Sequence, residues 1–165
     1  MDTTPFYAAA AALCFTLLGF WWVIVEFRHE LLTRDRLARR FAFVVSLHFL
    51  LPGLASLASL LVTGSMWRVV FALAGVTGLA WSLSVLLNGS HRTVGRAARG
   101  AWASLPLYAA VCLFAAAPDL ARSGLGLEPL QVEGLLLTLV LLVGVLLAWG
   151  VFTDPDLRGD VVLPG

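Results

Sequence analysis

The stretch GLLLTLVLLVGVLLAWGVF, residues 134–152, decides the fold class. It carries no charge and has the length that an α-helix needs to cross about 30 Å of hydrocarbon. Each backbone polar group inside a bilayer must find a partner within the protein, and a single stretch meets that condition only as a helix. The sequence therefore predicts a transmembrane helix at this position.

Four further apolar runs precede it, at about residues 7–27, 41–63, 67–88 and 101–117. The chain is 60% hydrophobic and 13% charged, whereas soluble domains carry roughly 25% charged residues. We therefore predict an all-α, polytopic transmembrane helical bundle of about five spans, forming a single domain over residues 1–165.

The run at 101–117 is the shortest and contains Pro106, so it could instead lie on the membrane surface and leave four spans. Arginine counts do not separate the two arrangements, because each places nine arginines on one side and two on the other. Seventeen residues without a charge need burial, which favours five spans.

The distribution of basic residues predicts the orientation. All eleven are arginines; five follow the first run, three follow the third, and Arg158 lies in the tail. Only Arg68 and Arg122 fall on the opposite side. Basic loops stay in the cytoplasm, so the N-terminus is predicted outside and the C-terminus inside. The arginine-only, alanine- and leucine-rich composition is typical of a bacterial protein, for which we expect the plasma (inner) membrane.

Several function classes have no support in the sequence. A formal net charge of +1 gives no basic surface for nucleic acid. Neither a glycine-rich phosphate loop nor a paired-cysteine metal motif is present. The predicted spans also lack a buried acid of the kind that proton-coupled carriers use, and no cofactor is expected.

His48 is the most informative polar residue, because it lies about 10 Å below the predicted cytoplasmic interface. Counting from the start of each run places Ser82 and Tyr108 at a similar depth, which suggests a polar layer with a hydroxyl partner for each imidazole nitrogen. Such a layer could line a transport path. It could equally hold helices together through a neutral histidine bonded to Ser82 or Tyr108.

A second polar group lies at the end of the first run, where Glu26 and His29 have the spacing of a carboxylate and an imidazole on one helix face. With Glu30 and His91 they form a weak candidate metal site. The two cysteines, Cys14 and Cys112, fall at similar depth and could be neighbours. Contact with lipid headgroups is expected from a basic segment beside the membrane, made of Arg34, Arg36, Arg39 and Arg40.

Small residues recur at four-residue spacing, which lets helix backbones approach closely in lipid. They are Ala74, Gly78 and Ser82 in one run, and Gly144 and Ala148 in another. The leading hypothesis is a non-catalytic accessory or assembly subunit that acts through helix packing, as a homo-oligomer or with a larger membrane partner. The alternatives are a small channel or transporter lined by His48, Ser82 and Tyr108, and a metal-dependent membrane enzyme.

Overall fold

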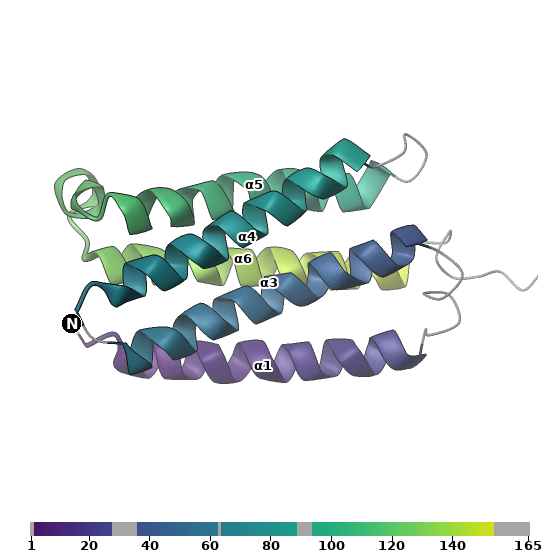
Figure 1. Ribbon diagram of the computed structural model, residues 1–165. Helices are drawn as coiled ribbons and strands as arrows, with labels where there is room; N and C mark the ends of the chain where they lie inside the picture. The colour runs from purple at the N-terminus through teal and green to yellow at the C-terminus, as the bar shows by residue number, and fades with distance from the viewer. Residues whose placement is uncertain (1, 28–35, 63, 89–93, 154–165) are drawn as a thin grey trace, which may run out of the picture.

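The computed structural model describes residues 2–27, 36–62, 64–88 and 94–153 (Figure 1). These residues form five α-helices and one short π-helix, and no β-strand occurs among them. The helices are α1 (Thr4–Phe27), α3 (Arg36–Leu61), α4 (Met66–Asn88), α5 (Val94–Ala116), the π-helix η1 (Ala121–Leu125) and α6 (Pro129–Thr153).

Four of the helices, α1, α3, α4 and α6, are long and apolar enough to cross a membrane. The apolar part of α5 is shorter, Trp102–Ala116. However, α5 runs lengthwise beside α4 and α6 rather than across the end of the bundle (Figure 1). Its residues Ser104, Tyr108 and Val111 are buried inside the bundle. The prediction of an all-helical membrane bundle of about five spans is confirmed, and the chain is a multi-pass membrane protein.

Helices that follow one another in the chain run antiparallel, so the bundle has two distinct ends (Figure 1). One end holds the start of α1, the turn between α3 and α4, and η1; we call it the η1 end. The turn depends on Gly64, whose φ of 66° lies in the left-handed region that glycine adopts without strain. Helix α1 lies at the edge of the bundle and packs mainly on α3, whereas α3 and α6 lie between the others.

Hydrogen bonds explain where α1 begins. The Thr4 N–H donates to the Asp2 carboxylate at 2.9 Å, and the Tyr7 N–H donates to the Thr3 carbonyl at 3.1 Å. Helix starts leave several N–H groups without partners inside the helix, and a carboxylate beside them is favourable. Hydrogen bonding from Thr4 stabilises the ionised carboxylate of Asp2 and so holds its pKa below the usual value.

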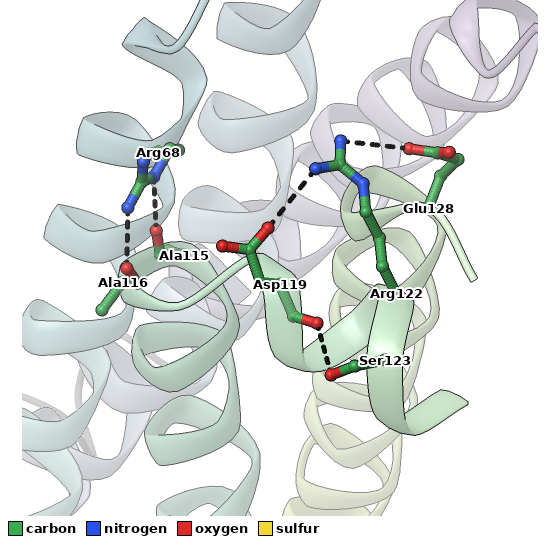
Figure 2. Close-up of polar contacts among 7 residues, drawn as sticks. All are labelled: Arg68, Ala115, Ala116, Asp119, Arg122, Ser123 and Glu128. Carbon is green, nitrogen blue, oxygen red and sulfur yellow. Dashed lines mark hydrogen bonds and ion pairs between the residues drawn. The ribbon is translucent and has the colours of Figure 1, made fainter. Parts of the chain in front are cut away.

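Arg68 of α4 caps the C-terminal end of α5. Its Nε donates to the Ala115 carbonyl at 2.9 Å and its Nη2 to the Ala116 carbonyl at 2.7 Å (Figure 2). The last carbonyls of a helix have no partner within it and carry partial negative charge, so a guanidinium there stabilises both the helix end and the contact between α4 and α5.

Helix α6 begins at Pro129, five residues before the apolar run that predicted it. Proline is favoured in the first helical position because its missing N–H would have no partner there. The Gln131 side chain accepts a hydrogen bond from the Glu128 N–H at 3.1 Å, which is one half of a capping box. Glu133, which the sequence reading placed in the connection before the helix, therefore lies inside α6.

Candidate functional site

His48 is buried at the centre of the bundle, with 1% of its surface exposed. Its Nδ1 lies 2.8 Å from the Val44 carbonyl oxygen, and its Nε2 lies 2.6 Å from the Ser104 hydroxyl oxygen. A carbonyl oxygen can only accept, so Nδ1 carries the proton in this arrangement. In the neutral imidazole, Nε2 then accepts a hydrogen bond from Ser104. Both ring nitrogens are satisfied by protein groups, one of them on the neighbouring helix α5.

The sequence predicted the wrong hydrogen-bond partners for the His48 ring. Neither Ser82 nor Tyr108 bonds the imidazole nitrogens, which are held by Val44 and Ser104. Tyr108 contacts the His48 ring through an edge, with ring centroids 5.7 Å apart. Ser82 is buried on α4, as the depth estimate implied. The actual partner on α5, Ser104, lies one helical turn before Tyr108. The prediction missed it because counting from the start of each apolar run misjudges the relative height of two helices by about a turn.

Three glycines of α4 and α6 provide the space that the buried side chains occupy. A Cβ on Gly78 would collide with the Tyr108 ring, one on Gly75 would lie 2.5 Å from the Cys112 sulfur, and one on Gly144 would lie 2.7 Å from the His48 Cβ. Side chains from one helix thus fill the space left by glycine on the next. Two further positions of the predicted small-residue stripes, Ala74 and Ala148, pack into the two hydrophobic clusters of the core, and the remaining position, Ser82, is also buried.

Glu133 is the ionisable residue that the sequence analysis missed. It is fully buried, contrary to the expectation that the spans carry no buried acid. Within the part of the chain that the structure describes, neither of its carboxylate oxygens has a hydrogen-bond partner. The α6 positions at helical spacing below it, Leu137, Val140, Gly144 and Leu147, are all buried, so Glu133 continues the core-facing side of α6.

A sequence signal for this placement exists in the segment Glu128-Pro129-Leu130-Gln131. Proline in the first position with glutamine two residues later predicts a helix start. Continuing the helix from there puts Glu133 on the same face as Leu137 and Gly144. Hydropathy alone assigns Glu133 to the connection before the span, because the uncharged run begins at residue 134.

The candidate metal site falls mostly outside the described residues. Glu26 is exposed near the end of α1, whereas His29, Glu30 and His91 lie outside them. Among the residues that the structure describes, no three His, Cys, Asp or Glu side chains are grouped to hold a metal ion.

The predicted headgroup contacts lie at the end of the bundle opposite η1. Arg39 and Arg40 are exposed there at the start of α3. Arg34 and the side chain of Arg36 lie outside the described part. Contact of this segment with lipid stays a prediction.

The two cysteines do not form a pair. Both are free thiols: Cys14 packs beside Gly53 of α3, and Cys112 packs beside Gly75 of α4. The sulfur of Cys112 lies 3.8 Å from the Ala72 carbonyl oxygen. Each cysteine thus fills a gap between a different pair of helices, as buried cysteine commonly does.

These features define the class of the protein as a multi-pass membrane helical bundle with a close-packed core. Comparison with protein-family models, with curated proteins and with solved structures gives no match. The functional argument therefore rests on the residues themselves.

Proposed function

We propose that this protein is a non-catalytic assembly subunit of a membrane complex, and that it docks a further transmembrane helix against α1. The observation that carries the proposal is a row of small residues on the exposed side of α1. Ala8, Ala12, Thr16 and Gly19 recur at helical spacing and are all exposed. The buried side of α1, formed by Tyr7, Ala11, Cys14 and Trp21, lies opposite. We call the exposed row the small-residue face of α1.

This face differs from the exposed side of α6. Most of the exposed residues of α6 are bulky, among them Leu135, Leu139, Leu142, Leu146 and Trp149, as expected where acyl chains are the only neighbours. On α1, a Cβ at Gly19 would meet nothing within 4 Å. The Thr16 hydroxyl donates to the Ala12 carbonyl at 2.8 Å, so the face offers no unpaired polar group to lipid. Small residues let two helix backbones approach closely, which favours association in a bilayer.

The small residues inside the bundle are not available to bind a further helix. Gly78 and Gly144 are occupied by Tyr108 and His48 of the same chain. His48 accordingly serves as a hydrogen-bonded contact between α3 and α5. A transport path past His48, Ser82 and Tyr108 would require space beside the imidazole, where Ser104, Gly144 and the Tyr108 ring are in contact with it. The packing function is therefore better supported than transport.

Leucine substitutions on α1 test the proposal. Ala12→Leu and Gly19→Leu should separate the docked helix and weaken association at least about tenfold, equivalent to roughly 1.4 kcal/mol. The measurement is the mass of the purified protein in mild detergent by size exclusion with light scattering, together with the identity of co-purifying membrane proteins. Ala80→Leu, on the exposed side of α4, is the matched control and should leave the mass unchanged.

A wild-type protein that is strictly monomeric in mild detergent and lipid nanodiscs, with no co-purifying partner, would contradict the proposal. So would equal loss of association in Ala80→Leu and Ala12→Leu. We further infer that the complex lies in a bacterial plasma membrane with the η1 end outside, as the arginine distribution suggests.

A further inference from the structure

We propose that the Glu133 carboxyl group is a proton-binding site at the η1 end of the bundle, covered by Phe6 and Tyr7 of α1. The starting observation is the isolation of this side chain. Glu133 has no exposed surface, and within the described chain both of its oxygens are without a partner. Ionisable groups inside a membrane bundle are rare, and they usually mark a functional site.

Among the residues that the structure describes, neither arginine at the η1 end bonds Glu133. Arg68, on α4, directs its guanidinium to the Ala115 and Ala116 carbonyls, and Arg122, on η1, lies 3.5 Å from both Asp119 and Glu128 at the surface (Figure 2). An ionised carboxylate buried without a partner costs several kcal/mol. The closed bundle therefore favours the neutral acid, with a proton bound to one of the two oxygens.

In the described chain, the titratable groups on other helices that would experience a charge on Glu133 are weak acids. They are the Tyr7 phenol on α1, which bonds the Leu130 carbonyl, and the Cys112 thiol on α5, which packs against Gly75 of α4. On α3 the neutral Ser56 lines a cavity together with Phe6 and Leu137. His48 lies beside Gly144, about three helical turns after Glu133 on α6. None of these groups supplies a positive charge, so a bound proton is the simplest way to neutralise the site.

The cover over Glu133 belongs to the first turn of α1. The Tyr7 hydroxyl donates to the Leu130 carbonyl at 2.6 Å, which ties α1 to the start of α6. The Phe6 ring lies against Gly134, where an added Cβ would be 2.7 Å from a ring carbon. A cavity of about 20 Å³ next to Phe6 is also lined by Ser56 and Thr138. That volume holds one water molecule.

The position on α6 also favours release of the proton when the cover opens. Glu133 lies four residues after Pro129, about 6 Å along the helix axis. Water that enters past Phe6 and Tyr7 would reach the carboxyl group at that depth and would lower the free-energy cost of ionising it. The site thus binds a proton when covered and releases it when hydrated.

Infrared spectroscopy of the full-length protein in lipid nanodiscs tests the site. At neutral pH the wild type should show the C=O stretch of a protonated carboxylic acid, and Glu133→Gln should lose that band. Glu128→Gln, an exposed acid at the same end of the bundle, is the matched control and should retain it. Glu133→Asp should shift the band, which gives a second reading if the glutamine variant folds poorly.

Tyr7→Phe tests the cover. The variant removes the bond to Leu130, so exchange of the Glu133 proton for deuterium should be at least severalfold faster than in the wild type. Equal exchange rates would overturn the role of Tyr7 as cover. Absence of the protonated-acid band in the wild type, or its persistence in both Glu133→Gln and Glu133→Asp without a shift, would overturn the site. Loss of the band on replacing choline chloride with sodium chloride would make it a cation site instead.

Discussion

At the scale of single residues, the core shows two ways to bury a polar side chain. His48 is held by a carbonyl of its own helix and by Ser104 of α5, so neither ring nitrogen loses a hydrogen bond on leaving water. Glu133 has no such partner in the described chain. This contrast is the reason why we propose a packing role for the histidine and proton binding for the glutamate.

Removing the Ser104 hydroxyl should destabilise the bundle. Ser104→Ala leaves Nε2 of a buried imidazole without a donor, which costs about 1–3 kcal/mol. Unfolding in mixed micelles measures the change, and Ser123→Ala, on the exposed η1, is the control with an expected effect near zero. The loss should largely vanish when Ser104→Ala is made in a His48→Leu background. A full loss in that background would show that the hydroxyl acts elsewhere.

Sequence reasoning identified His48 as buried but chose the wrong partner. The membrane depth of a residue was counted from the start of its own apolar run, and such counts differ between helices by about one turn. One turn is the separation of Ser104 from Tyr108 along α5. Glu133 was missed for a different reason. Hydropathy treats a charge as the end of a span, whereas the capping residues Glu128 and Gln131 start α6 before it.

At the scale of helices, close packing depends on glycines that accept a side chain from the neighbouring helix. The contact of α4 with α5 is built this way, with Tyr108 seated on Gly78 and Cys112 on Gly75. The apolar runs located each of the five α-helices in the described part of the chain, because length and hydrophobicity are properties of one segment. Whether a small residue packs against another helix of the bundle depends on how the two helices are rotated relative to each other. The sequence of one segment does not determine that rotation.

A methyl group at Gly78 should therefore be costly. Gly78→Ala forces the Tyr108 ring to move, and overpacking of this kind costs about 1–3 kcal/mol. Gly19→Ala is the same substitution in a position with nothing within 4 Å, and it should be neutral or slightly stabilising. The comparison requires unfolding measurements on both variants in detergent. Equal destabilisation would show that the cost arises from the helix backbone and not from the Tyr108 contact.

At the scale of the whole molecule, the fold gathers the chain connections, and the described arginines with them, at two opposite ends of the bundle. Arg68 and Arg122 lie at the η1 end, and Arg39 and Arg40 lie at the opposite end. The arrangement with about five spans depends on α5, which packs against both α4 and α6. Orientation follows from arginine distribution and stays a prediction.

Labelling of single cysteines in intact cells tests the five-span arrangement most directly. In a background with Cys14 and Cys112 replaced by alanine, Ser65→Cys and Gly124→Cys should both react with a membrane-impermeant maleimide added outside. Arg40→Cys should react only after permeabilisation. All three positions are exposed in the structure. Reaction of Ser65→Cys together with protection of Gly124→Cys would place these two positions on opposite sides of the membrane and contradict the fifth span.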